Sequence, residues 1–298
     1  MSEETCRLPD GVEICFERFG DPADPAMLLV MGLGTQMLGW NEEFCATLAD
    51  RGFHVIRFDN RDIGRSTYLR DLPVPRLRHL IARRGASYSL SDMAADAVGL
   101  LDQLEIDRAH VVGASMGGMI AQTIAIEHPD RALSLVSIMS NTGSRITGQP
   151  SPRVLPLFLS PMPRGRDAYV ERLMKLYGLI GSPGFTRDKE EMRRDFGRAY
   201  DRGVNPAGNL RQLAAIQTAP HRRTALRRVD APTLVIHGTK DRLVGCSGGR
   251  ATAKAIPGAR LLLIDGMGHD LPRGAWDQII DGIAENAARA EAPAGAAA

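Results

Sequence analysis

The stretch that most constrains how this chain can fold runs from His110 to Met119. It begins with an apolar, β-branched segment ending at Val112, which is typical of a short buried strand. Gly113-Ala-Ser-Met-Gly117 follows, and then a helical pattern that Pro129 ends. This strand–turn–helix sequence fits the G-x-S-x-G elbow, whose strained serine needs small residues two positions before and after it. The alternative is a glycine-rich turn that carries a solvent-exposed serine.

The elbow predicts that Ser115 lies at the N-terminus of the helix, where backbone N–H groups face any group bonded to the serine. A serine hydroxyl is a poor nucleophile at neutral pH and needs a base within hydrogen-bond reach. Histidine suits this task, because its ordinary pKa of about 6.5 lets it accept a proton near pH 7. Activity of such a site should therefore fall on the acid side.

His269 is the candidate base among the seven histidines of the chain. It lies in Gly266-Met-Gly-His-Asp-Leu-Pro272, just past an apolar strand that ends at Ile264. The glycines before it allow the loop to turn the imidazole inward over the edge of the sheet. We expect structural or surface roles for the other six, which are His54, His79, His110, His128, His221 and His237.

Asp241 is the candidate acid that would hold the imidazole in the correct tautomer. It follows the predicted strand Thr233–His237. The order Ser115, Asp241, His269 is the nucleophile–acid–histidine order of one large class of hydrolases. Asp265 and Asp270, which flank the histidine loop, are weaker alternatives.

Two backbone amides are the candidates for an oxyanion hole, the pair of N–H donors that a tetrahedral intermediate needs. The first is the amide of Met116, directly after the serine. The second is the amide of Leu33, because Gly32 and Gly34 on either side let the backbone approach a substrate closely. The alternative for this second segment is a plain β-turn.

Apolar strands alternate with helices along most of the chain. A hairpin is predicted over Thr5–Phe19, and buried strands over Met27–Met31, His54–Phe58, Leu133–Met139, Thr233–His237 and Arg260–Ile264. Such alternation predicts an α/β fold with a doubly wound, mainly parallel central sheet and helices on both faces. Ligands bind such sheets beyond the carboxyl ends of the strands, where the candidate residues above are found.

The segment 143–228 has a different pattern. Prolines interrupt its first part, and three amphipathic helices follow without any strand, at about Asp167–Leu179, Arg187–Tyr200 and Ala207–Thr218. We therefore predict a hydrolase-like core over 1–142 and 229–290, a helical cap over 143–228 and a disordered tail over 291–298.

Composition narrows the possible partners. A net charge of +2 over 298 residues does not indicate nucleic-acid binding, and no apolar stretch approaches the roughly 20 residues of a membrane span. The four cysteines form no metal-binding spacing, so we expect no metal and no cofactor. The acidic N-terminus lacks the features of a secretory signal, and the predicted compartment is therefore the cytoplasm.

Basic residues are unevenly distributed. Residues 153–228 contain 16 Lys and Arg against 7 Asp and Glu, and residues 65–84 contain 6 against 1. In the second segment Leu77, Leu80 and Ile81 form a possible apolar stripe. These arginines form either a solvated, salt-bridged surface or a basic entrance that attracts anionic acyl substrates or an anionic lipid surface, so peripheral membrane contact is one possibility.

The chain resembles the α/β-hydrolase fold family along nearly its whole length. Phe19–Pro25, Val30–Gly32, Asp59–Ser66 and Gly266–His269 are similar to a bacterial group that includes the aclacinomycin methylesterase and mycobacterial lipase/esterases. Met31–Gly34, Val112–Gln122 and Gly266–Pro272 more closely resemble the mycobacterial enzymes. This resemblance implies that Ser115, Asp241 and His269 form a catalytic triad and that the helical insertion is a cap. The chain departs from many relatives at Met31, where they have histidine, and at Asp62, where they have glycine.

These observations predict a serine carboxylesterase that works through an acyl-enzyme on a small-molecule or lipid-like ester. A thioesterase, an acyltransferase, a cofactor-free perhydrolase or a C–C bond hydrolase would use the same triad. A ligand-binding relative with little turnover is the alternative from a different class. The sequence leaves the acyl chain, the alcohol and the oligomeric state open.

Overall fold

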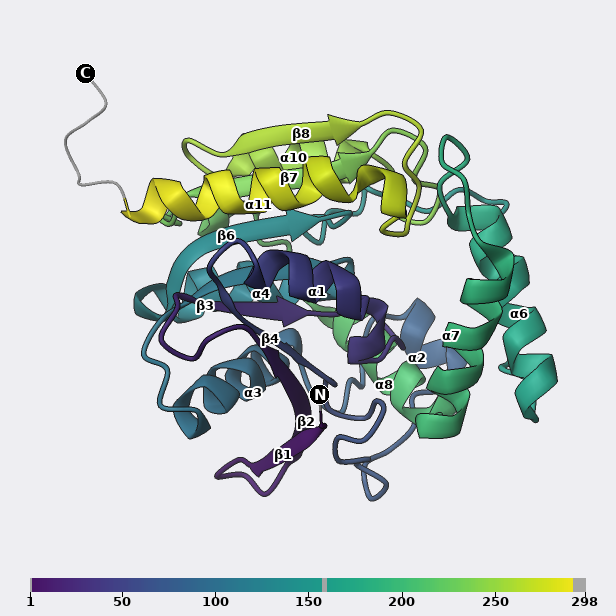
Figure 1. Ribbon diagram of the computed structural model, residues 1–298. Coiled ribbons are helices and arrows are strands. Elements are labelled where there is room, and N and C mark those ends of the chain that lie inside the picture. The colour runs from purple at the N-terminus through teal and green to yellow at the C-terminus, as the bar shows by residue number, and fades with distance from the viewer. Residues whose placement is uncertain (1, 157–159, 292–298) are drawn as a thin grey trace.

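A computed structural model of the chain describes residues 2–156 and 160–291 (Figure 1). The described residues form one eight-stranded sheet in the order β1-β2-β4-β3-β5-β6-β7-β8. The strands are β1 (Glu4–Arg7), β2 (Glu13–Phe19), β3 (Ala26–Val30), β4 (His54–Phe58), β5 (Ala109–Ala114), β6 (Ala132–Ile138), β7 (Thr233–Gly238) and β8 (Arg260–Ile264). The pairs β1–β2 and β2–β4 are antiparallel and the remaining pairs are parallel, which confirms the predicted α/β fold.

Helices cover both faces of the sheet. They include α1 (Glu42–Ala49), α3 (Leu90–Gln103), α4 (Met116–Glu127), α10 (Ser247–Ala255) and α11 (Trp276–Glu291), with short 3-10 turns at Met37–Gly39, Pro129–Arg131 and Arg273–Ala275. Alternate side chains of β3 belong to the hydrophobic clusters on opposite faces of the sheet. Leu28 and Val30 join the cluster under α3 and α4, whereas Met27 and Leu29 join the cluster under α1 and α11. Strand side chains alternate between faces, so one strand serves both cores.

Local sequence signals set the helix ends. Ser89 caps α3 and forms a capping box with Asp92, and Asn41 accepts a hydrogen bond from the amide of Glu43 at the start of α1. The helix α10 was not predicted. Its buried residues are small (Gly248, Gly249, Thr252 and Ala255), so it packs closely without the apolar stripe by which an amphipathic helix is recognised.

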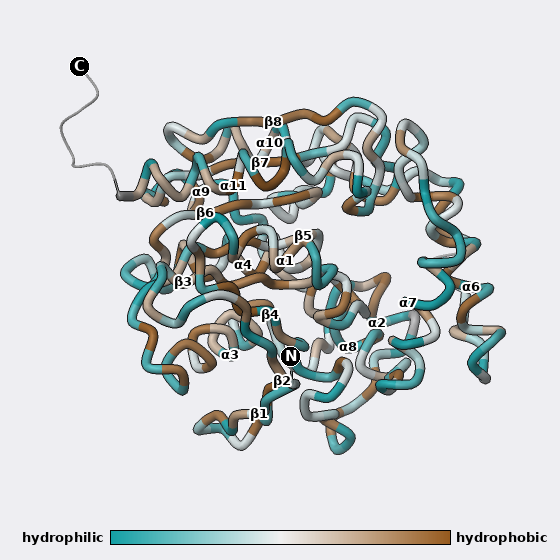
Figure 2. The backbone as a smooth tube through the Cα atoms, viewed as in Figure 1, coloured by the Kyte–Doolittle hydropathy of each residue, from teal (hydrophilic) through white to brown (hydrophobic). Residues whose placement is uncertain are grey.

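The segment between β6 and β7 contains α6 (Arg166–Ile180), α7 (Lys189–Arg202), α8 (Pro206–Thr218) and the short α9 (Arg223–Leu226). Figure 1 shows α6, α7 and α8 on the side toward which the arrowheads of β3, β6 and β8 point. Figure 2 shows α7 as mostly hydrophilic, in contrast to the hydrophobic central strands. No described residue of 143–228 belongs to a strand. The short helix α2 (Leu77–Ile81) lies against α8.

The domain boundaries at 143 and 228 stay predictions. The predicted disordered tail lies outside the described residues, apart from Glu291, which ends α11. Within the described residues, no helix combines the length and apolarity that crossing a membrane requires.

Candidate active site

Ser115 occupies the turn between β5 and α4, with φ 58° and ψ −118°. A serine rarely adopts a positive φ, and here the surrounding backbone holds it. A Cβ atom added at Gly113 would lie 2.1 Å from the Gly117 carbonyl oxygen, and one at Gly117 would lie 2.0 Å from the Val30 carbonyl oxygen. Both glycines are therefore required for the strand, turn and helix to pack this closely.

His269 lies in the loop after β8 and faces the serine. Its Nε2 atom is 3.0 Å from Ser115 Oγ, and its Nδ1 atom is 2.7 Å from Asp241 Oδ2. The last residue of α6 and the segment after it hold this loop. The amide of His269 donates to the Ile180 carbonyl at 2.8 Å, and the amide of Gly268 donates to the Ser182 hydroxyl at 2.8 Å. The imidazole thus lies between the serine and the carboxylate.

Asp241 lies in the loop after β7 and is fixed by that loop. Its Oδ1 atom accepts hydrogen bonds from the amides of Leu243 and Val244 at 2.8 and 2.9 Å, which leaves Oδ2 for His269. Burial alone would favour the neutral acid, but the neighbouring imidazoles of His269 and His237 hold the pKa of Asp241 at about 2. The group is therefore an anion at neutral pH.

The structure does not place the alternative acids against the imidazole nitrogens. Asp265 accepts a hydrogen bond from the Thr239 hydroxyl at 2.8 Å, and Asp270 is bonded to the Ser182 hydroxyl. Sequence reasoning assigned no site role to His237, which is fully buried with Nε2 3.4 Å from Asp241 Oδ2 and 2.8 Å from the Val244 carbonyl. It supports the acid but does not contact Ser115 in the described structure.

The segment of Leu33 forms a β-turn and also leaves its amide available. The amide of Thr35 donates to the Gly32 carbonyl at 3.2 Å, and Gly34 has a φ of 67°, as the third residue of a type II turn requires. A Cβ atom on Gly32 would lie 3.1 Å from Ser115 Cβ, so the turn lies directly beside the serine. Among the described residues, neither the amide of Leu33 nor that of Met116 has a hydrogen-bond acceptor.

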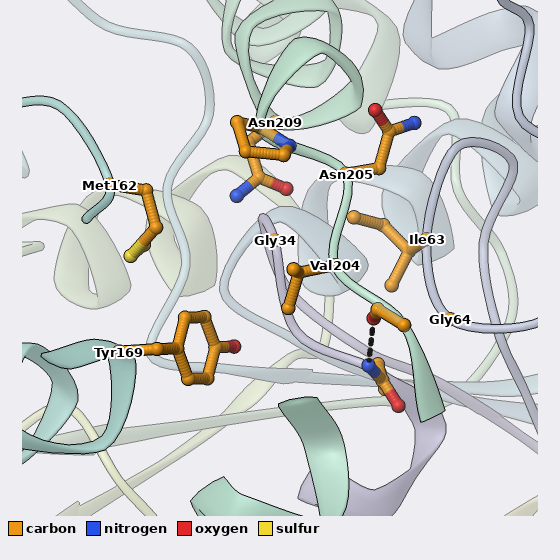
Figure 3. A pocket seen from close by; sticks show the side chains of 11 residues that line it. Gly34, Ile63, Gly64, Met162, Tyr169, Val204, Asn205 and Asn209 are labelled. Atoms are coloured by element: carbon orange, nitrogen blue, oxygen red, sulfur yellow. Dashed lines mark hydrogen bonds between the residues drawn. The ribbon is translucent and has the colours of Figure 1, made fainter. Parts of the chain in front are cut away.

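The helix α8 was not predicted to touch this turn, yet the Gln212 Oε1 atom accepts a hydrogen bond from the Gly34 amide at 3.0 Å. Figure 3 shows a small pocket beside the turn, which is lined by Gly34 together with Asn209 of α8 and Tyr169 of α6. Its volume of about 10 Å³ accommodates roughly one water molecule. No signal within the helix itself indicates these contacts.

Part of the positive charge of the insertion is buried rather than exposed. Arg202 pairs with Glu3 at 2.7 Å and with Asp59 at 2.8 Å, and Arg211 pairs with Asp62 at 2.7 Å. In contrast, no ion pair joins the arginines around α2 to a carboxylate of the described residues; these are Arg76, Arg78, Arg83 and Arg84. In the parts of the chain that the structure describes, no three His, Cys, Asp or Glu side chains are grouped so that they could hold a metal ion.

Comparison with known proteins identifies the family of the chain. The model of the alpha/beta hydrolase fold family matches residues 25–272. Rhodomycin D methylesterase DauP from a Streptomyces species is 31% identical over 297 residues, which cover 92% of this chain and 94% of that protein. Rhodomycin D methylesterase DnrP from Streptomyces peucetius is 30% identical over 294 residues, with the same coverage of 92% and 94%.

The solved structure of esterase RhEst1 from Rhodococcus sp. ECU1013 is also similar. It superposes with a TM-score of 0.76 over 97% of this chain and 99% of that chain, and at 20% identity this likeness shows the fold alone. The predicted resemblance to the α/β-hydrolase family and its methylesterase group is confirmed. A family match over most of the chain, with relatives of about 30% identity along nearly its whole length, shows that this chain belongs to the alpha/beta hydrolase fold family and is a hydrolase.

Proposed function

We propose that the chain is a serine carboxylesterase, which hydrolyses carboxylic esters through a covalent acyl-enzyme. The observation that carries this proposal is the row of contacts from Ser115 Oγ to His269 Nε2 at 3.0 Å and from His269 Nδ1 to Asp241 Oδ2 at 2.7 Å. A hydroxyl within reach of a base, whose second nitrogen is held by a carboxylate, is the arrangement of an activated serine.

In the proposed acylation step, Ser115 Oγ attacks the ester carbonyl carbon and its proton passes to His269 Nε2. The tetrahedral oxyanion accepts hydrogen bonds from the amides of Leu33 and Met116, which serve as the oxyanion hole. His269 then returns the proton to the alkoxide leaving group, so the alcohol departs and the acyl group stays on Ser115. Asp241 stabilises the imidazolium between these two transfers.

In the proposed deacylation step, water takes the place of the alcohol. His269 accepts a proton from the water as it attacks the acyl carbon, and a second tetrahedral intermediate forms in the same oxyanion hole. Its collapse breaks the bond to Ser115 Oγ, which regains its proton from His269. The acid is released and the enzyme is restored.

Two observations bear on the substrate. The relatives DauP and DnrP are named methylesterases, which supports an ester with a small alcohol. The arginines around α2 support an anionic or lipid-like acyl group, and the salt dependence of ester hydrolysis tests this choice. A cytoplasmic location stays a prediction.

The test compares wild type with Ser115→Ala on p-nitrophenyl esters of increasing chain length, methyl esters and thioesters. Loss of the nucleophile should lower kcat by about 10⁶, as in other enzymes of this design. Ser140→Ala is a matched control, because Ser140 packs against Gly118 in the elbow helix. Near-normal ester turnover by folded Ser115→Ala would refute the assignment. Faster turnover of thioesters would indicate a thioesterase, and wild type without turnover would indicate a ligand-binding relative.

A further inference from the structure

The helix α8 is tied to the turn that carries Leu33. The amide of Gly34 donates to Gln212 Oε1 at 3.0 Å, and Gln212 Nε2 donates to the Arg61 carbonyl at 3.0 Å. The Gln212 side chain is 0% exposed, so both bonds are shielded from water. Asn209 of the same helix also packs against the turn, because a Cβ atom added at Gly34 would lie 3.2 Å from the Asn209 side chain. Gln212 thus links the turn to the loop that follows β4.

These contacts fix the direction of the Leu33 amide. The peptide plane between Gly32 and Leu33 is held at its carbonyl by the amide of Thr35, at 3.2 Å. The next plane, between Leu33 and Gly34, is held at its N–H group by Gln212, at 3.0 Å. Both planes adjoining Leu33 are therefore restrained, and its free N–H group has one orientation beside Ser115.

A buried ion pair sets the position of α8 itself. Arg211 donates to both oxygens of Asp62, with Nε to Oδ2 at 2.7 Å and Nη2 to Oδ1 at 2.7 Å. Their side chains are 1% and 0% exposed. Asn205 Nδ2 adds a bond to Asp62 Oδ1 at 3.1 Å, and a Cβ atom on Gly208 would lie 2.5 Å from the Asp62 carbonyl oxygen.

Asp62 has a φ of 71°, in the left-handed region that favours glycine. The side chain of Asp62 therefore strains the backbone. Its carboxylate also accepts hydrogen bonds from the Tyr88 hydroxyl at 3.0 Å and the Leu69 amide at 2.9 Å. The carboxylate is thus fixed from several sides. The two hydrogen bonds from Arg211 hold α8 against this carboxylate, and the next residue, Gln212, lies opposite Gly34.

We infer that Gln212 is a positioning residue for the proposed ester hydrolysis, held in place by the Asp62–Arg211 pair. It does not touch the reacting atoms. It holds the turn so that the Leu33 amide points at the oxygen of the tetrahedral intermediate, and it therefore acts on the transition state more than on the bound ester. This inference rests on the proposed function.

The kinetic test compares Gln212→Met with Gln217→Met, a control at the other glutamine of α8, for which the described residues provide no hydrogen bond. Removal of one oxyanion donor costs about 10² to 10³ in kcat, and a loosened donor should cost less. We expect Gln212→Met to lower kcat by about 10-fold or more, with KM changed less than about 3-fold. The affinity of a trifluoromethyl ketone, whose adduct carries the same oxyanion, should fall in proportion. The acid limb of the pH profile should not move, because His269 is untouched.

A second measurement does not depend on turnover. Hydrogen exchange of the Gly34 amide should be faster in Gln212→Met than in wild type or Gln217→Met, because its acceptor is lost. Gln212→Asn, which is too short to reach both groups, gives a milder variant with the same expected sign if Gln212→Met does not fold.

Unchanged protection of Gly34, or a kcat within two-fold of wild type, would overturn the inference. Faster exchange at Gly34 in a protein whose wild type hydrolyses no ester would overturn the proposed function and still support the contact between Gln212 and the turn. The two proposals can therefore fail separately.

Discussion

The carboxylate of Asp241 accepts from two amides of its own loop through Oδ1 and lies 2.7 Å from His269 Nδ1 through Oδ2. One carboxylate oxygen therefore binds the loop, and the other binds the imidazole. The loop fixes the plane of the carboxylate, and this plane fixes the imidazole that faces Ser115. Since the pKa of Asp241 is held at about 2, the carboxylate is charged at every pH at which a histidine ordinarily titrates.

We predict that Asp241→Asn lowers kcat for an activated ester by about 10⁴. The amides of Leu243 and Val244 will keep the amide oxygen at the place of Oδ1, so the NH₂ group will face His269 Nδ1. The imidazole must then carry its proton on Nε2 and cannot accept one from Ser115.

Steady-state kinetics of the purified variant checks this prediction, with Asp265→Asn as the control on the neighbouring loop. Activity of Asp241→Asn within a few-fold of wild type, together with a large loss in Asp265→Asn or Asp270→Asn, would move the role of the acid to one of those residues.

His110 should make the protein less stable in mild acid. Its side chain is 1% exposed, lies 2.9 Å from Ser134 Oγ and packs edge-on against Phe53. Burial lowers the pKa of His110 to about 4. Between about pH 6.5 and pH 4 the unfolded chain binds a proton that the folded chain does not, so stability falls as the pH falls.

The loss attributable to His110 over this range is about 3 kcal/mol. Urea unfolding of wild type and His110→Leu at several pH values measures it, and the difference between their free energies of unfolding should shrink or reverse toward pH 4. If the free energy of unfolding depends on pH in the same way in both proteins, His110 takes up its proton equally in the folded and unfolded chains, and the prediction is wrong.

Substitutions of Asp62 and Arg211 should have non-additive effects on the free energy of unfolding. Asp62→Gly relieves the backbone strain of a side chain at φ 71°. It also leaves the buried guanidinium of Arg211 without its carboxylate. Breaking a buried pair in this way typically costs 3–5 kcal/mol, whereas replacing both partners by apolar groups is often neutral.

We therefore expect Asp62→Gly to destabilise the protein by about 3 kcal/mol or more. Adding Arg211→Met should restore much of this loss, which urea denaturation of the four proteins of the cycle will measure. Additive effects of the two substitutions would mean that the pair carries no coupling energy.

The basic segment around α2 predicts a salt effect that depends on the substrate. Arg76, Arg78, Arg83 and Arg84 have no carboxylate partner among the described residues, and Ile81 beside them is 75% exposed. The short helix α2 packs against α8, the helix whose Gln212 contacts the turn of Leu33. An anionic ester should be attracted to it, and the attraction is screened beyond a Debye length of about 8 Å at physiological salt.

For an anionic ester kcat/KM should therefore fall as ionic strength rises, while a neutral ester of equal chain length should barely respond. Changing the four arginines together to serine should flatten this difference. Identical salt profiles for both esters in the wild-type enzyme would leave the solvated, salt-bridged surface as the correct interpretation.

Features that depend on short-range interactions could be predicted from the sequence. The elbow around Ser115, the buried strands and the capping box of Ser89 follow from patterns within a few residues, because strand and helix periodicity and helix caps are local properties. Chain order then brought Asp241 and His269 to the same edge, since the carboxyl ends of parallel strands meet there.

The contacts that hold this edge of the sheet join distant parts of the chain. Gln212 meets Gly34 across 178 residues and Arg211 meets Asp62 across 149, and neither pairing has a signal in the local pattern of α8. The role of His237 beside Asp241 was likewise hidden, because a histidine that ends a strand looks the same whether it packs or supports an acid. Such contacts depend on which of many polar side chains end up buried together, and a buried polar group is stable only where its partner arrives from elsewhere in the chain.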